Sequence, residues 1–260
     1  MAEPRAVRNL LYRLVGFGDP TLADELHNQT PGRGGSEPSA QEASTSDGVK
    51  PMTGCVIVTP DERCWLRATA LTEAVGQAML HAAHRIEEGD CLPLGRELVR
   101  LGSVVRQAPR LALRTSYPTL ALSQFSPVVA MEFLAPTVVS QGGSSHLSLP
   151  SPAHLIRGWA RKWNAFAPRE MAIGEDTSSA VARNCRIGAG ARIETVECDQ
   201  PTAMIGFVGI VPFEAVSPKS WSAGERQAFA ALTAFSQFCG SGARTMQGMG
   251  ATVPAEGLSG

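Results

Sequence analysis

The chain has 260 residues, 43% of them hydrophobic and 18% charged, a balance typical of a globular protein with a substantial core. No apolar run approaches the roughly 18 residues that a membrane-spanning helix needs, and the start lacks the apolar stretch of a signal peptide. We therefore expect a soluble, cytoplasmic protein. The net charge of −1 excludes a protein that coats nucleic acid along its whole length.

Cysteine and lysine usage narrows the expected chemistry. Six cysteines are scattered without a C-x-x-C pair or a histidine at zinc spacing, which predicts reduced thiols and no metal or other cofactor. Lysine occurs only at Lys50, Lys162 and Lys219, so arginine supplies most of the positive charge. Arginine binds phosphates and stacks on bases better than lysine does. A high-GC coding bias would produce the same excess, so both explanations stay open.

The first half of the chain is predicted to contain helices, then a polar break, then strands. Apolar residues at helical spacing predict helices over residues 4–16 and 21–27. Residues 28–50 are rich in Pro, Gly and Ser and nearly free of large apolar side chains, so we expect a flexible loop there. Beyond it the pattern predicts strands over 52–58, 64–69 and 98–107, and a helix over 71–86.

The pattern restarts after Pro109. In this second half we expect strands over residues 123–139, 203–213 and 245–253, a hairpin over 181–198, and helices over 152–166 and 223–238. Each half is therefore an α+β unit without the strict strand–helix alternation of a parallel sheet. Two tandem ferredoxin-like units (β-α-β-β-α-β, RRM-like) account for length and element count, with domains over residues 1–115 and 116–260.

A glycine-rich stretch near the end, Gly240-Ser-Gly-Ala-Arg-Thr-Met-Gln-Gly-Met-Gly250, indicates a loop that faces phosphate. Glycine reaches positive φ cheaply and permits close approach of a ligand. The spacing fits neither nucleotide-binding fingerprint, which favours a phosphate backbone over a mononucleotide. A tight turn between a helix and a strand is the structural alternative. The candidate RNA-binding residues here are Gly240, Gly242, Arg244, Thr245, Gly248 and Gly250.

Several motifs together resemble one family. Gly206-Phe-Val-Gly-Ile-Val-Pro-Phe213, followed by Phe238-Cys-Gly-Ser-Gly-Ala-Arg-Thr-Met-Gln-Gly-Met-Gly250, is similar to the C-terminal motif of CRISPR-associated endoribonucleases of the RAMP superfamily. Phe133-Leu-Ala-Pro-Thr137 with Leu149-Pro-Ser-Pro152 resembles the middle motif of that family. Leu22-Ala-Asp-Glu-Leu-His27 resembles the segment that bears its catalytic histidine.

The resemblance implies metal-independent cleavage of precursor CRISPR RNA within its repeats. In that reaction the 2′-hydroxyl of the RNA attacks the adjacent phosphate and leaves a 2′,3′-cyclic phosphate on the mature guide RNA. Such a reaction needs a base, an acid and a cation. The resemblance assigns the first two roles to His27 and Tyr12 and the cation to Lys50, with Arg33 as a rival. A half-buried structural tyrosine and a helix-capping histidine are the alternatives.

Basic residues elsewhere form two further candidate RNA surfaces. The helix over 152–166 carries Arg157, Arg161 and Lys162, which would grip phosphates or form a solvated face. The predicted hairpin carries Arg183, Arg186 and Arg192, a surface that would clamp a repeat stem.

The sequence departs from the family at its start. Members begin with a strand, whereas this chain begins almost inside the first helix, so either the first strand is missing or the true start lies upstream. The alternative function is an inactive RAMP protein that binds repeat RNA or serves as a subunit of a CRISPR effector complex. The expected partners are repeat RNA, precursor and mature; other effector subunits and a homodimer are further options.

Overall fold

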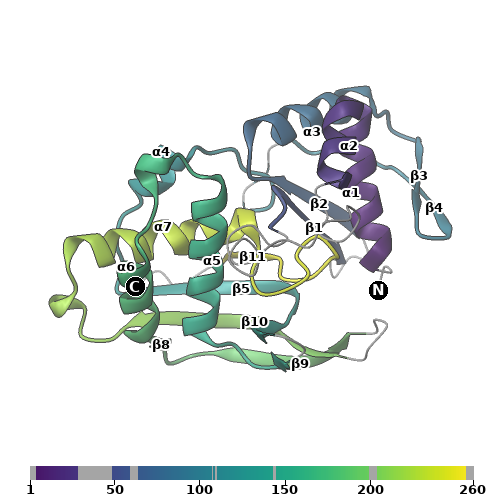
Figure 1. Ribbon diagram of the computed structural model, residues 1–260. Coiled ribbons are helices and arrows are strands. Elements are labelled where there is room, and N and C mark those ends of the chain that lie inside the picture. The colour runs from purple at the N-terminus through teal and green to yellow at the C-terminus, as the bar shows by residue number, and fades with distance from the viewer. Residues whose placement is uncertain are drawn as a thin grey trace, which may run out of the picture.

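The computed structural model describes residues 4–28, 49–58, 64–106, 108, 110–142, 145–198 and 204–255. Helices and strands are mixed throughout these residues, so the predicted α+β class is confirmed. Figure 1 shows the N-terminal elements, in purple and blue, beside a larger sheet with helices over one face. The last segment of the chain, in yellow, passes between the two groups.

The larger sheet is antiparallel and belongs to the C-terminal half. Its central strands are β5 (Val128–Thr137) and β10 (Met204–Ala215), which pair with each other. Strand β11 (Thr252–Pro254) pairs with the other side of β5, whereas β8 (Cys185–Ile187) and β9 (Arg192–Cys198) both pair with β10. With its first and third strands in the centre, this sheet has the arrangement of a β-α-β-β-α-β unit.

The predicted hairpin over residues 181–198 is wrong. Its first residues belong to helix α6 (Glu175–Arg183), and β8 and β9 follow each other along the same edge of β10 instead of pairing together. Ile187 lies opposite Phe213, and Arg192 lies opposite Ile210. The intervening glycines therefore interrupt one edge strand and do not reverse the chain.

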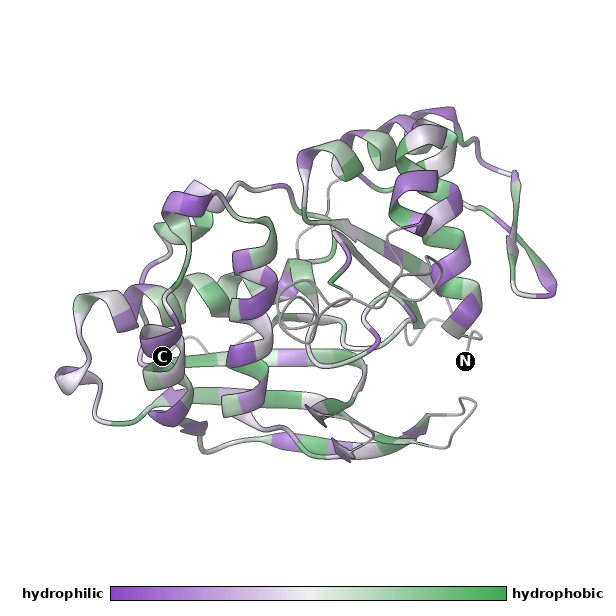
Figure 2. Cartoon of the chain, in the orientation of Figure 1, coloured by the Kyte–Doolittle hydropathy of each residue, from purple (hydrophilic) through white to green (hydrophobic). Residues whose placement is uncertain are grey.

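Helices α5 (Pro152–Phe166) and α7 (Ala223–Cys239) cover this sheet and bury its apolar side chains. The ring centroids of Trp159 on α5 and Phe213 on β10 are 5.4 Å apart, and both residues are buried. Figure 2 shows β5 and β10 mostly in the green of hydrophobic residues beneath these helices. Because the buried face alternates along β5, polar residues such as Glu132 are left partly exposed.

The N-terminal half is smaller. Its elements are α1 (Pro4–Gly18), α2 (Pro20–Asn28), β1 (Met52–Val58), β2 (Cys64–Ala70) and α3 (Glu73–Arg85). Within the described residues its sheet is the antiparallel hairpin β1–β2, in which Met52 pairs with Ala70. Leu11 of α1, Leu26 of α2 and Val75 of α3 pack together in its core.

Short elements complete the fold. The expected strand over residues 98–107 is largely wrong, because the strand there, β4 (Glu97–Arg100), pairs only with β3 (Cys91–Leu94) in a hairpin that projects from the molecule (Figure 1). The remaining elements are α4 (Tyr117–Ala121), β6 (Val139–Gly142), β7 (Ser145–Leu147), η1 (Arg169–Met171) and η2 (Pro218–Ser220). The predicted flexible loop lies mostly outside the described residues. No described helix is long and apolar enough to cross a membrane.

Candidate active site and nucleic-acid interface

The three side chains predicted to carry catalysis lie together: two of them bond to one backbone carbonyl, and the third packs against one of those two. Tyr12 lies on α1, His27 lies in the last turn of α2, and Lys50 precedes β1. The Lys50 ammonium donates to the Leu26 carbonyl oxygen at 2.7 Å, and the Tyr12 hydroxyl reaches the same oxygen at 3.5 Å. The rings of Tyr12 and His27 meet edge to face, with centroids 5.5 Å apart. We call Tyr12, His27 and Lys50 the catalytic cluster.

The tight turn between α1 and α2 positions this cluster. The Asp19 backbone N–H donates to the Val15 carbonyl at 2.7 Å, and the Asp19 carboxylate accepts from the Leu22 N–H at 3.0 Å, so Asp19 links the two helices. Leu26 is only 5% exposed and packs in the core with Leu11. Burial of Leu26 fixes the last turn of α2 and thereby the carbonyl that Tyr12 and Lys50 share.

Arg8 adds a second cation to this neighbourhood. Burial raises the pKa of Tyr12, an effect that the positive charge of Arg8 partly opposes. Burial also lowers the pKa of Lys50, and repulsion from Arg8 lowers it further. The Arg8 Nε is buried without a hydrogen-bond partner in the described part of the chain. Two cations close enough to repel each other favour an anionic ligand such as phosphate.

Sequence reasoning missed Arg8, although one signal was available. Arg8 lies four residues before Tyr12, and residues four apart on a helix share a face. The rival cation, Arg33, lies outside the described residues, so the choice between Lys50 and Arg33 stays a prediction. Among the residues described, no group of three or more His, Cys, Asp or Glu could hold a metal ion.

The glycine-rich loop over residues 240–250 has the backbone conformation predicted for it. All four glycines have positive φ, with values of 65° at Gly240, 72° at Gly242, 93° at Gly248 and 71° at Gly250. Arg244 also adopts a left-handed conformation, with φ of 57°. A residue other than glycine rarely adopts this conformation unless its surroundings impose it. The loop is therefore shaped by its contacts as well as by its glycines.

Hydrogen bonds hold the base of this loop against the sheet. The Ser241 N–H donates to the Gly250 carbonyl at 2.8 Å, which closes the loop. The Gly250 N–H donates to the Pro136 carbonyl at 3.0 Å, and the Ala243 N–H donates to the Val138 carbonyl at 2.8 Å. The loop is thus a rigid extension of β5.

The loop also contacts the N-terminal half, where the catalytic cluster lies. The Thr245 carbonyl accepts from the Gly54 N–H on β1 at 3.0 Å. Met246 is 9% exposed and packs in the core with Leu26 and, at its edge, Tyr12. A phosphate on the loop would therefore lie near the catalytic cluster. No sequence pattern indicated this contact, because Met246 is far from that cluster along the chain.

The three basic residues predicted on α5 do not share one surface. Arg157 and Arg161 are exposed, as a phosphate-binding face requires. Lys162 is only 8% exposed, so the expectation that it contacts phosphate is corrected. It lies on the same side of α5 as Trp159 and Trp163, and the packing of that side carries the ammonium group inward.

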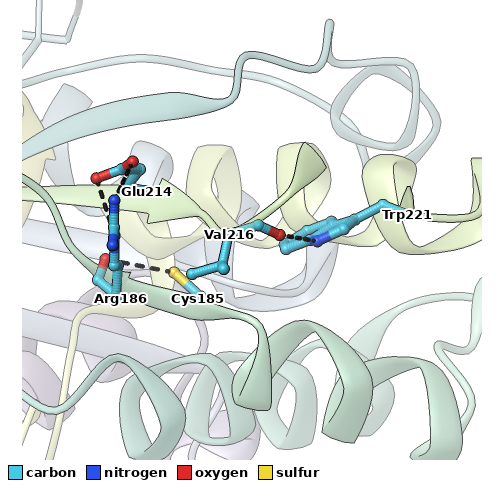
Figure 3. Close-up of polar contacts among 5 residues, drawn as sticks. All are labelled: Cys185, Arg186, Glu214, Val216 and Trp221. Carbon is cyan, nitrogen blue, oxygen red and sulfur yellow. Dashed lines mark hydrogen bonds and ion pairs between the residues drawn. The ribbon is translucent and has the colours of Figure 1, made fainter. Parts of the chain in front are cut away.

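The second predicted basic surface, formed by Arg183, Arg186 and Arg192, has part of its charge neutralised by an ion pair. Arg186 donates to Glu214 through two nitrogens, at 2.7 Å and 3.2 Å, as Figure 3 shows. This pair raises the pKa of Arg186 and lowers the pKa of Glu214. In the same view the Trp221 indole donates to the Val216 carbonyl and anchors the end of β10. Arg183 and Arg192 are exposed and stay candidates for RNA contact.

Comparisons with known proteins agree with this geometry. A family model described as CRISPR-associated endoribonuclease Cas6 matches residues 131–252. A solved Cas6 product complex is 25% identical, with a TM-score of 0.77 over 98% of this chain and 94% of that chain. Thermus thermophilus Cas6 is 24% identical, with a TM-score of 0.66 over 96% of this chain and 90% of that chain. A Cas6-related protein of Pyrococcus furiosus is 12% identical, with a TM-score of 0.55 over 99% of this chain and 92% of that chain. No curated protein sequence matches.

The resemblance to Cas6 is confirmed. The tandem ferredoxin-like fold that it implies is confirmed as well, since the solved Cas6 structures match over nearly the whole chain. The family model begins at residue 131 and ends at 252, so it includes the glycine-rich loop but not Tyr12, His27 or Lys50. The roles of those three residues stay predictions, as does the division into domains at residue 115.

Proposed function

We propose that this chain is a Cas6-type endoribonuclease that cleaves precursor CRISPR RNA within its repeats. The family model over residues 131–252 supports the class of enzyme. The observation that carries the proposal is a compact cluster: Tyr12 and Lys50 share the Leu26 carbonyl, and the His27 ring packs against the ring of Tyr12. A base, an acid and a cation are the groups that RNA cleavage by its own 2′-hydroxyl requires.

The reaction is a transesterification that needs no metal and no external nucleophile. The 2′-oxygen forms a bond to the adjacent phosphorus, the bond from phosphorus to the 5′-oxygen breaks, and a 2′,3′-cyclic phosphate remains. His27 takes the proton from the 2′-hydroxyl, because an imidazole accepts protons near neutral pH. Tyr12 keeps its proton, since burial raises its pKa, and donates it to the departing 5′-oxygen. Lys50 stabilises the negative charge on the phosphorane.

Arg8 is assigned to the phosphate as well. Its buried Nε has no hydrogen-bond partner among the described residues, and a phosphate oxygen would supply one. Its charge repels that of Lys50, and a bound phosphate would relieve this repulsion. Arg8→Ala and Arg8→Lys should both slow cleavage, because lysine cannot reproduce the planar donor geometry of arginine.

The two halves have different roles in this proposal, one in cleavage and the other in RNA binding. The N-terminal domain, residues 1–115, carries the catalytic cluster, and the C-terminal domain, residues 116–260, holds the RNA. In the latter the glycine-rich loop binds the backbone next to the cut, through the amides of Gly242, Thr245 and Gly248 and the side chain of Arg244. Arg157 and Arg161 on the outer face of α5 bind phosphates farther along the strand, and the product remains bound.

The test is cleavage of labelled single-stranded repeat RNA in EDTA, beside the same RNA with one 2′-deoxy nucleotide at the cut. We expect cleavage of the first substrate only, with a cyclic phosphate end. His27→Ala should reduce the single-turnover rate by about 10²–10⁴-fold, the usual contribution of general acid–base catalysis. His84→Ala is the matched control, because His84 is an exposed histidine on α3. Equal rates for His27→Ala and wild type would refute the catalytic assignment.

One observation favours the alternative, an inactive RAMP protein that binds repeat RNA. Lys50 already donates to the Leu26 carbonyl at 2.7 Å, a contact that a purely structural lysine would make. Tight binding of the repeat RNA without any cleavage would support this alternative. Under that outcome Lys50→Ala would lower the melting temperature and leave RNA affinity unchanged.

A further inference from the structure

Helix α7 directs its C-terminal end, which carries a partial negative charge, toward the loop proposed to bind phosphate. Its C-terminus at Cys239 leads directly into the glycine-rich loop over residues 240–250. The C-terminal end of a helix carries a partial charge of about −0.5, and anions normally bind at the opposite end. If the loop faces RNA, something must offset the negative potential where α7 ends.

A buried lysine lies at that end. The Lys162 ammonium donates to the Cys239 carbonyl at 2.7 Å, to the Gly240 carbonyl at 3.2 Å and to the Thr245 hydroxyl at 3.4 Å. These three acceptors match the three donors of a charged ammonium group. The neighbouring thiol does not neutralise it, because burial raises the pKa of Cys239 to about 12 and keeps that group protonated.

A second cation reaches the same helix end from the N-terminal half. Arg67 on β2 donates to the Gln237 carbonyl at 2.7 Å and to the Leu111 carbonyl at 2.9 Å. Between the two cations, the Thr53 hydroxyl on β1 donates to the Phe238 carbonyl at 3.2 Å. The last carbonyls of α7 are thus satisfied by side chains from three other elements. Figure 1 shows β1 and β2 meeting the yellow loop at this point.

Neither cation forms an ion pair with a carboxylate in the described part of the chain. Within the described residues, carboxylate ion pairs form at Arg110 and Arg186, not at Arg67 or Lys162. Burial lowers the pKa of Lys162 and that of Arg67, whereas the carbonyl oxygens that accept their hydrogen bonds favour the charged forms. Positive charge on both groups exceeds the partial charge of about −0.5 at the helix end and leaves the base of the loop positive. Lys162 is buried and Arg67 is half-buried, so an anion bound on the nearby loop would offset part of the cost of keeping both residues charged.

We propose that Lys162 and Arg67 are positioning residues that reverse the electrostatic sign at the C-terminus of α7, so that the glycine-rich loop accepts an RNA phosphate. The inference rests on the proposed function, in which this loop faces RNA. It adds a charge that acts through the loop without touching the RNA. It also makes phosphate binding depend on the contact between the two halves, since Arg67 and Lys162 lie on opposite sides of it.

The test distinguishes the effect of the positive charge of Lys162 from the effect of its hydrogen bonds to the loop. Lys162→Gln keeps an N–H donor for the loop carbonyls and removes the charge, whereas Lys162→Met removes both. Lys219→Gln is the matched control, an exposed lysine in η2 just before α7. The probe is single-stranded repeat RNA with a 2′-deoxy nucleotide at the cut, titrated at low and high salt, with the melting temperature recorded for each variant.

We expect Lys162→Gln to bind this RNA about tenfold more weakly than wild type, in the range of helix-terminus charge effects. The deficit should persist at high salt, because buried charges are screened less than exposed ones. Arg244→Ala should instead reduce the slope of affinity against salt, since an exposed contact releases counterions. Lys219→Gln should match wild type in affinity, in salt dependence and in single-turnover cleavage.

If the Lys162→Gln variant folds and binds RNA with wild-type affinity, the proposal is overturned. Lys162 would then only hold the loop in place through its hydrogen bonds. If Lys162→Gln does not fold, Arg67→Gln gives the same test from the other half, with the same expected loss. Unchanged affinity in Arg244→Ala would show that the loop does not face RNA, and the inference would then fail together with that assignment. Cleavage by the same preparations reports separately on the proposed enzymatic function.

Discussion

Gly250→Ala should destabilise the fold more than any other single-methyl addition in the loop. A Cβ at Gly250 would lie 1.9 Å from the Ser241 carbonyl oxygen, and φ there is +71°. Ser241 cannot move aside, because its N–H donates to the Gly250 carbonyl at 2.8 Å, and Gly250 is itself bonded to Pro136. The left-handed backbone costs about 1 kcal/mol and the loss of two hydrogen bonds about 1 kcal/mol each, so we expect about 2–4 kcal/mol.

The assay is urea denaturation, with Gly248→Ala as the control from the same loop. A Cβ at Gly248, where φ is +93°, would meet only the Val7 side chain at 3.5 Å, an ordinary contact. That variant should lose about 1 kcal/mol, the cost of the backbone conformation alone. Equal losses in the two variants would refute the reasoning, because the difference between them is the clash with Ser241.

Three further predictions concern stability and pH. Ser222→Ala should cost about 1 kcal/mol in urea denaturation, because Ser222 and Glu225 exchange the two hydrogen bonds of a capping box at the start of α7. Gly158→Ala should stabilise the protein by about 0.5–1 kcal/mol, since a Cβ there meets nothing within 4 Å and alanine favours the helix; a loss of stability would contradict this. Burial raises the pKa of Cys55 from 9.0 to about 11, so the unfolded thiol ionises first and stability should fall as pH rises through that window. Cys55→Ala should show a shallower decline in melting temperature between pH 9 and 11 than wild type.

Local sequence patterns predicted most of the helices and strands. The helix expected over residues 223–238 is α7, Ala223–Cys239, and the strands expected over 52–58 and 64–69 are β1 and β2. These elements have strong periodicity and clear capping or turn residues at their ends. The hairpin over 181–198 failed, because two glycines there predict a reversal as readily as the break in an edge strand that the structure contains. Only the pairing partner, β10, distinguishes these outcomes.

The residues of the candidate site were likewise predicted only in part. Tyr12, His27 and Lys50 could be named from the sequence by their resemblance to a family, and their catalytic roles stay predictions. Helical spacing to Tyr12 was the available signal for Arg8. Met246 could not be named, because its importance comes from what lies beside it in space. Lys162 was misplaced for the same reason: its spacing to Arg157 is compatible with an exposed stripe, but the tryptophans on α5 turn it inward.

Patterns along the chain were enough to predict most local conformations: which segments are helical, where much of the chain is extended, and that the glycines of the loop over residues 240–250 favour positive φ. These properties depend on residues close together along the chain. Which charges are buried, which carbonyls they satisfy and that Met246 packs beside Leu26 and Tyr12 became apparent in the three-dimensional structure. Those properties depend on distances between segments far apart in sequence, and hydrophobic packing fixes them only when the two halves are assembled.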